Sequence, residues 1–160
     1  MADITSLLDE AGVDYDLLEH EHTERAADEA EALGVTPEEV AKTLVLATPS
    51  GNVRAVLPAS ERVDLPKVAD LLGAGHKQVQ MASEDDMKRD YPDFALGAVP
   101  PLGGTAGDRV IVDSRVAERD SVVLEAGSHE RSVRLKSADL VRLAGARVAD
   151  IAKDEERTAG

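Results

Sequence analysis

The sequence contains no cysteine, and this absence excludes several kinds of chemistry. Disulfide bonds, thiolate nucleophiles and thiolate metal ligands all require cysteine. Tryptophan is also absent, and aromatic residues make up only 2% of the chain. No apolar run approaches the roughly 20 residues needed to span a bilayer, and the N-terminal residues lack the features of a secretory signal. We therefore expect a cytoplasmic protein that does not enter a membrane.

Lysine is scarce, with 6 residues against 12 arginines. Acidic residues number 32 and are spread along the whole chain, which gives a formal net charge of −14. An evenly acidic, lysine-poor surface is typical of proteins that work in concentrated salt, where screening makes self-repulsion tolerable. The composition thus predicts a halophilic source. It does not exclude a nucleic-acid partner, because a local basic site can still bind an RNA end.

The length and the order of hydrophobic patterns predict the fold. A chain of 160 residues with 42% hydrophobic residues is long enough for one core. We expect a single domain over residues 1–153 and a flexible C-terminal tail over 154–160. Interleaved helices and strands with hairpin-like connections predict an α+β fold with a mixed, mostly antiparallel β-sheet or partial barrel flanked by helices. Helices are expected near 3–11, 24–33, 37–41, 65–72, 84–90 and 137–143, and strands near 13–20, 42–48, 53–58, 77–81, 108–113, 121–126, 131–136 and 148–152.

Several short motifs, in a fixed order, resemble one family. They are His20, Ala27 to Ala30 with Leu33-Gly34-Val35, the strand entry Val40-Ala41-Lys42-Thr43-Leu44-Val45, the loop Gly97-Ala98-Val99-Pro100-Pro101, Val110-Ile111-Val112-Asp113, and Glu125-Ala126-Gly127-Ser128-His129. Together they extend over residues 20 to 130. In this order and spacing the chain resembles the stand-alone aminoacyl-tRNA editing domains of the YbaK/EbsC type, which are related to the editing insertion of prolyl-tRNA synthetases.

The resemblance implies a function. Domains of this type are trans-editing aminoacyl-tRNA deacylases, which hydrolyse the ester that joins a wrong, small amino acid to tRNA. It implies the aminoacyl-tRNA 3′ end as partner and leaves open a synthetase as a second one. It also implies hydrolysis without a metal or another cofactor, in which a water attacks with help from the ribose hydroxyl of the tRNA. The alternative is a non-catalytic module of the same fold that binds tRNA ends or a synthetase.

Lys42 is the most distinctive position for chemistry. It lies at the mouth of a strand that otherwise reads as core, and an unpaired ammonium is costly to bury. Its side chain must therefore reach a cleft, a carboxylate or a ligand anion, and a structural ion pair is the simpler alternative. By resemblance, Lys42 would be catalytic and would hold the terminal adenosine or its phosphate. Thr43 would bind substrate through its hydroxyl, unless it is only a strand former.

The loop from Gly97 to Gly104 is the second candidate element. Ester hydrolysis needs donors directed at the carbonyl oxygen as it becomes an oxyanion, and backbone N–H groups near a glycine can serve. Gly97 is therefore a candidate catalytic residue, and Ala98, Val99 and Pro100 are candidates for contact with substrate. Because glycine and proline mark turns in all proteins, an ordinary connecting loop is the alternative.

Histidines and one aspartate complete the candidate set. Gly127, Ser128 and His129 follow a strand and would form either a pocket edge that binds substrate or a tight hairpin turn. Asp113 ends a strand, where an Asx-turn is favoured over support of the pocket. His20 and His22 are two apart on an expected strand among several glutamates, but that spacing is not a dedicated metal motif, so no metal site is predicted. His20 is expected near the pocket mouth by resemblance.

Overall fold

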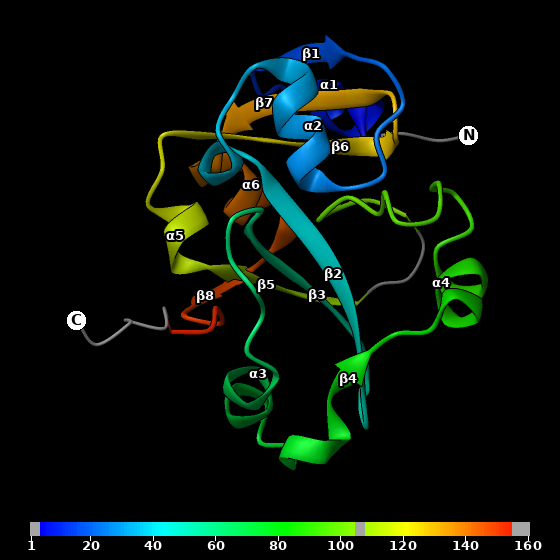
Figure 1. Ribbon diagram of the computed structural model, residues 1–160, viewed down its shortest axis with the longest axis vertical. Coiled ribbons are helices and arrows are strands. Elements are labelled where there is room, and N and C mark those ends of the chain that lie inside the picture. Colours follow the sequence, from blue (N-terminus) through cyan, green and yellow to red (C-terminus); the bar gives the residue numbers. More distant parts are fainter. Residues whose placement is uncertain (1–3, 105–107, 155–160) are drawn as a thin grey trace.

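The computed structural model describes residues 4–104 and 108–154, and its strands form two sheets (Figure 1). The helices are α1 (Thr5–Ala11), α2 (Ala26–Leu33), α3 (Leu65–Leu72), α4 (Glu84–Asp90), α5 (Ser114–Ala117) and α6 (Ser137–Ala144), with 3₁₀ turns η1 (Pro37–Glu39) and η2 (His76–Gln78). The strands are β1 (Tyr15–Glu19), β2 (Ala41–Thr48), β3 (Gly51–Pro58), β4 (Gln80–Met81), β5 (Arg109–Asp113), β6 (Ser121–Ser128), β7 (Arg131–Lys136) and β8 (Arg147–Ala149).

The larger sheet is mixed and has the strand order β4-β2-β3-β5-β8. β2 and β3 form a long antiparallel hairpin in which Lys42 is opposite Leu57. β5 and β8 continue the sheet in parallel, because each is reached through a connection that contains helices. The smaller sheet is antiparallel, with the order β1-β7-β6.

The two sheets meet where β2 begins. Val40, just before β2, forms a parallel bridge with Val123 of β6, and both side chains are fully buried. Figure 1 shows the smaller sheet at the top with α1 and α2 beside it, and the β2–β3 hairpin extending downward towards α3 and β4. The first residues of β2 therefore lie at the junction of the two sheets.

Local sequence explains most of the helix ends. α1, α2 and α3 each stop at a glycine in the left-handed region, because this conformation strains residues that carry a Cβ. Thr36 and Glu39 form a capping box around Pro37, and Ser83 caps α4. Over residues 4–104 and 108–154, no helix has the length and apolar character needed to cross a membrane.

The expected α+β class with mixed, mostly antiparallel pairing is confirmed, with the pairing divided between two sheets. Four local expectations need correction. Residues 77–81 form η2 and the two-residue β4 instead of one strand, and α5 was not anticipated. Ser137, which its position in the sequence predicts as the N-cap of the last helix, is instead the first residue of α6, and its buried hydroxyl has no hydrogen-bond partner among the described residues. The strand expected over 42–48 is not core along its whole length, because within that range only Val45 and Leu46 are buried. Residues 155–160 of the expected tail lie outside the described residues.

Candidate active site

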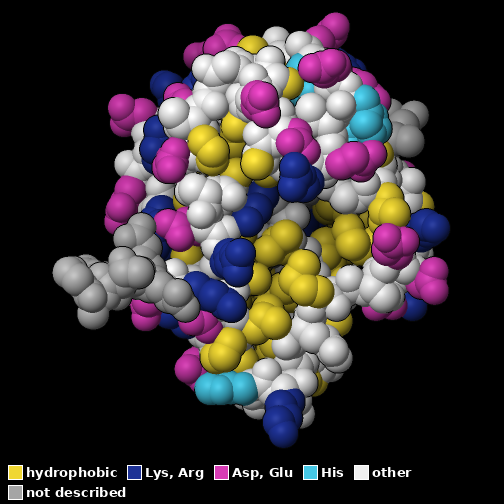
Figure 2. All heavy atoms as spheres, in the orientation of Figure 1, with side chains coloured by type: hydrophobic (Ala, Val, Ile, Leu, Met, Phe, Trp, Pro, Cys, Tyr) yellow, Lys and Arg dark blue, Asp and Glu magenta, His cyan; other side chains and the backbone are white. Residues whose placement is uncertain are grey.

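A cavity of about 190 Å³ opens at the junction of the two sheets. It is smaller than the roughly 300–1,000 Å³ typical of sites for drug-sized ligands, so it fits a small group. On the face shown in Figure 2, Lys and Arg side chains border a band of hydrophobic side chains. The cavity is lined by Glu24, Arg25, Ala26, Glu29, Ala41, Lys42, Thr43, Leu44, Gly97, Ala98, Val99 and Glu125.

Lys42 enters the cavity from the second residue of β2. Its side chain is half-buried, and within the described chain its ammonium forms no ion pair or hydrogen bond. Burial lowers the pKa of Lys42, and the nearby charge of Arg62 lowers it further, while Glu61 acts in the opposite direction. Lys42 is thus an unpaired cation beside a second cation. This arrangement suits an anionic ligand and does not match the structural ion pair considered as the alternative.

The loop that carries Gly97 forms another part of the cavity wall. Gly97 has φ +81°, a left-handed conformation that strains residues with a Cβ. Ala98 N donates to Ala95 O at 2.9 Å, which makes a tight turn around Gly97. Among the described residues, the N–H of Gly97 makes no hydrogen bond. The loop thus presents an unused backbone donor at a residue that lines the cavity.

An irregularity in β6 fixes the position of this loop. The register of β6 with β7 shifts between Glu125 and Ser128, so Ala126 and Gly127 have no partner on β7. Their carbonyl groups bind other segments instead. Ala126 O accepts from Ile4 N at 3.0 Å, and Gly127 O accepts from Ala95 N at 2.9 Å. The expected hairpin is present, but Gly127 and Ser128 still belong to β6 and the turn lies at His129 and Glu130. The hydrogen bond at the bulge connects the segment before Gly97 to the smaller sheet.

His129 lies beneath the same loop. Its Nε2 donates to Leu96 O at 2.7 Å, and a Cβ added to Gly97 would lie 3.6 Å from its Cε1. The ring is buried, and its Nδ1 is 3.1 Å from Glu125 Oε2. These two atoms make no hydrogen bond with each other, and neither makes one with any other described residue. His129 therefore holds the turn at Gly97 through Leu96 O and lies next to the carboxyl of Glu125, which lines the cavity.

Two buried carboxyl groups form the inner part of the cavity. Glu29 of α2 is fully buried, and burial raises its pKa to about 7 although a hydrogen bond from Ser132 acts in the opposite direction. Burial, followed by the charges of Glu29, Glu24 and Glu130, raises the pKa of Glu125 to about 9. The more exposed lining residues thus include two cations, Lys42 and Arg25, and the carboxylate of Glu24. The buried carboxyls of Glu29 and Glu125 hold their protons more readily than exposed ones.

His20 reaches the cavity only indirectly. Its Nε2 is 2.8 Å from the hydroxyl of Ser132, which donates to the Glu29 carboxyl that lines the cavity. His22 pairs instead with Glu24 and Glu130 at the surface. Across residues 4–104 and 108–154, no group of three or more His, Cys, Asp or Glu is arranged to hold a metal ion.

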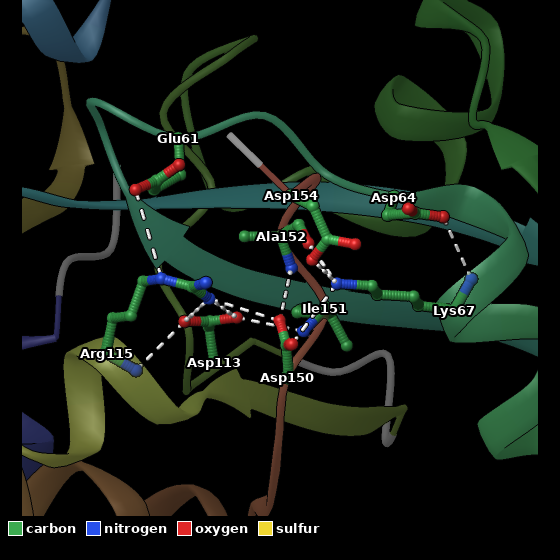
Figure 3. Close-up of polar contacts among 9 residues, drawn as sticks. All are labelled: Glu61, Asp64, Lys67, Asp113, Arg115, Asp150, Ile151, Ala152 and Asp154. Atoms are coloured by element: carbon green, nitrogen blue, oxygen red, sulfur yellow. Dashed lines mark hydrogen bonds and ion pairs between the residues drawn. The ribbon is translucent and has the colours of Figure 1, made fainter. Parts of the chain in front are cut away.

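Asp113 has a structural role away from the cavity (Figure 3). This fully buried carboxylate accepts from Arg115 N at 2.9 Å and from Ile151 N at 2.9 Å, and it pairs with the Arg115 guanidinium. Asp150 joins Arg115 to Lys67, so the network fastens the segment after β8 to β5 and α3. The Asx-turn expected at Asp113 is present, and Asp113 is not among the residues that line the cavity, so its position does not favour contact with substrate.

The structure separates the predicted site residues into groups. Lys42, Thr43, Gly97, Ala98 and Val99 line the cavity. His20, Pro100, Gly127 and His129 contact groups that line or anchor its wall, whereas Ser128 is paired with Arg131 in the hairpin. Reasoning from the sequence missed Glu29, Glu125 and Arg54. Glu125 and Arg54 are single charged residues in apolar strands, which is the same signal that singled out Lys42.

Comparison with known proteins gives the class of this fold and site. Residues 20–143 match the aminoacyl-tRNA editing domain family, and the chain belongs to that family. It is 27% identical over 146 residues to the multifunctional Ser/Thr-tRNA deacylase ProXp-y of Escherichia coli, covering 88% of this chain and 86% of that protein. It is 25% identical over 127 residues to EbsC of Enterococcus faecalis, named as a candidate Cys-tRNA(Pro)/Cys-tRNA(Cys) deacylase, covering 79% and 76%.

Solved structures have the same fold. The crystal structure of the hypothetical protein APE2540 superimposes with a TM-score of 0.85 at 24% identity, covering 94% of this chain and 99% of that one. A candidate trans-editing enzyme for prolyl tRNA synthetase gives a TM-score of 0.84 at 24% identity, covering 94% and 95%. The resemblance drawn from the sequence motifs is therefore confirmed at the level of family and fold.

Proposed function

We propose that this domain hydrolyses the ester bond between a small, wrongly attached amino acid and the 3′ end of a tRNA, acting on the charged tRNA in trans. The observation that carries the proposal is the cavity itself. It is lined both by Lys42 and by Gly97, whose ammonium and N–H make no hydrogen bond to the described residues, and its size admits only a small acyl group. Family membership supports the choice of an aminoacyl ester as substrate.

Each wall of the cavity has a separate role in this reaction. Lys42 binds the terminal nucleotide of the tRNA through its phosphate or ribose oxygens, because an ammonium without a carboxylate partner favours an anion or an acceptor. The N–H of Gly97 donates to the ester carbonyl oxygen, where negative charge develops as the tetrahedral intermediate forms. Thr43, Ala98 and Val99 line the space beside the acyl group.

The bond changes are those of ester hydrolysis. A water molecule, activated with help from the neighbouring ribose hydroxyl of the tRNA, attacks the carbonyl carbon. The intermediate then collapses, the bond to the ribose oxygen breaks, and that oxygen takes up a proton. The products are the free amino acid and uncharged tRNA. No covalent bond to the protein is required, and the cavity size excludes larger amino acids where binding contacts alone would discriminate weakly.

The test is a deacylation assay with tRNAs charged with Ala, Ser, Cys, Thr or Pro, run in concentrated potassium chloride with Lys42→Ala in parallel. We expect release of one or a few small amino acids by the native protein and loss of that release in the folded variant. A folded native protein that releases none of them would contradict the proposal. The domain would then be better described as a module that binds tRNA ends or a synthetase.

A further inference from the structure

The inner part of the cavity carries carboxyl groups that lack donors. Glu29 and Glu125 present four oxygen atoms, and within the described chain only Glu29 Oε2 accepts a hydrogen bond, from Ser132. Glu125 Oε2 is fully enclosed, 3.1 Å from His129 Nδ1, and accepts no hydrogen bond from the described residues, so the oxygens that are not fully enclosed are the Oε1 atoms of the two carboxyls. Buried acceptors of this kind are rare in folded proteins unless a ligand or water supplies the missing donors.

The cationic and acidic side chains of the cavity differ in burial. Lys42 is half-buried, whereas Glu29 is fully buried and the side chain of Glu125 is only 12% exposed. An aminoacyl-tRNA end has the same polarity, because its phosphates are anionic and the α-amino group of its amino acid is cationic. The two molecules match when the nucleotide lies at the rim and the amino acid lies inside.

We propose that Glu29 and Glu125 form a subsite for the α-ammonium group of the aminoacyl ester, so that the domain discriminates against esters that lack this charge. An ammonium supplies several donors to the unpaired carboxyl oxygens, and its charge favours their ionised form. The inference rests on the proposed function. It adds that recognition depends on a group common to all amino acids, while cavity size selects the side chain.

The charged groups around the subsite are consistent with this role. Glu29 faces His129 and, through Ser132, His20; Glu125 faces His129 and the surface carboxyls of Glu24 and Glu130. His129 is engaged with Leu96 O through its Nε2 and supports the Gly97 loop. An ammonium that binds Glu125 would therefore be held next to the loop that contacts the ester carbonyl.

The test replaces the ammonium without changing the size of the substrate. The native protein is assayed on one tRNA charged with alanine and on the same tRNA carrying lactate, in which a hydroxyl replaces the amino group; serine and glycerate are used if serine is the amino acid released. Each rate is divided by the spontaneous rate, because the ammonium itself activates the ester. We expect the aminoacyl ester to be hydrolysed at least about tenfold more efficiently than the hydroxyacyl ester.

Variants of Glu29 and Glu125 then test whether these two carboxyls cause the preference for the aminoacyl ester. Glu125→Gln and Glu29→Gln are expected to lower kcat/KM on the aminoacyl ester by about 10- to 100-fold and to reduce the preference for the ammonium, with the lactate ester little affected. Glu118→Gln, at an exposed position after α5, should retain the native preference. Thermal unfolding confirms that each variant is folded.

The possible outcomes separate the two proposals. Equal acceleration of both esters by the native protein overturns the ammonium subsite and leaves the deacylase function intact. A preference that persists unchanged in folded Glu29→Gln and Glu125→Gln also overturns it. If the native protein hydrolyses no ester of the panel, the proposed function fails and the subsite fails with it.

Discussion

The guanidinium of Arg54 and the carboxylate of Asp108 form an ion pair that is almost completely buried, with Nε and Oδ2 3.0 Å apart. Arg54 belongs to β3, yet its other two nitrogens donate to Pro100 O at 2.8 Å and Gly103 O at 2.7 Å. Tyr91 donates to Asp108 at 2.5 Å and lies beneath the guanidinium. A single side chain of the central sheet thus holds the loop that begins at Gly97 at two points.

We predict that Arg54→Lys lowers deacylation by about tenfold or more while the protein still folds. Lysine retains a cation beside Asp108 but lacks the planar fork that reaches the two carbonyls, and small displacements of a catalytic group are costly. A fall in kcat larger than the rise in KM, with a cooperative thermal transition, would support a positioning role. Arg54→Met leaves Asp108 unpaired in the core and should destabilise the fold by about 3–5 kcal/mol.

Lys42 should affect activity without supporting stability. Because its ammonium is half-buried and unpaired, Lys42→Met is expected to leave the free energy of unfolding unchanged or slightly higher while deacylation is lost. Lys77→Met, at an exposed position in η2, is the matched control and should retain activity. A loss of several kcal/mol in Lys42→Met, measured by urea unfolding, would indicate a structural ion pair instead.

Gly97→Ala tests the loop through its backbone conformation. Alanine at φ +81° is strained by about 1–2 kcal/mol, so the turn should shift and deacylation should fall strongly. Gly12→Ala is a matched control, because Gly12 ends α1 at φ +69° with nothing within 4 Å of an added Cβ. Both variants should lose similar stability in thermal unfolding. If both also lost activity to the same extent, a specific role for the Gly97 loop would be contradicted.

The raised pKa values of Glu29 and Glu125 predict that their contribution to stability falls as the pH rises. In the unfolded chain both carboxyls ionise near 4.5, whereas in the folded protein they keep their protons up to about 7 and about 9. Burial of these carboxyls therefore costs no stability below about pH 4.5, where both states are protonated. The cost grows as the pH rises towards about 7 for Glu29 and about 9 for Glu125. Relative to native protein, Glu29→Gln should gain about 1–3 kcal/mol of stability between about pH 5 and about pH 8. Glu118→Gln should show no such gain in urea unfolding.

The net charge predicts a dependence on salt. With a formal charge of −14 on 160 residues, self-repulsion opposes the compact state in dilute buffer. Raising potassium chloride from about 0.1 M to about 2 M should screen this repulsion and increase the unfolding temperature. An unfolding temperature that does not change with salt would remove the physical basis for the halophilic interpretation of the composition.

Much of the fold could be predicted because its signals are local. Gly12, Gly34 and Gly73 mark helix ends, and the turn at residues 49–52 sets the β2–β3 hairpin. The division into two sheets was not predicted, because strand order depends on contacts between distant segments. The error at residues 77–81 has a similar cause, since Lys77 and Gln78 belong to the 3₁₀ turn η2 and only Gln80 and Met81 pair with β2.

The sequence predicted cavity residues only where they belong to a motif of the resembled family. Lys42 and Gly97 were found because each departs from its local pattern and belongs to the family resemblance. Glu29 was missed because a glutamate in an alanine-rich helix looks like an exposed surface residue, and its burial results from packing against Ser132 of another strand. Asp113 was correctly assigned to a turn from its own sequence context, and its second partner, Ile151 N, is distant in the chain.

The bulge in β6 interrupts the regular pairing of the hairpin and at the same time positions parts of the candidate site. Ala126 and Gly127 give up pairing with β7, and their carbonyls position α1 and the loop before Gly97. A shorter strand that paired without interruption would be the more ideal hairpin, yet it would release both of those segments. Changes of chain length within 125–131 should thus be tolerated much less than exchanges of surface side chains. A redesign that removed the bulge would make the pairing of β6 with β7 more regular, but it would also remove the hydrogen bonds that position the loop of the candidate site.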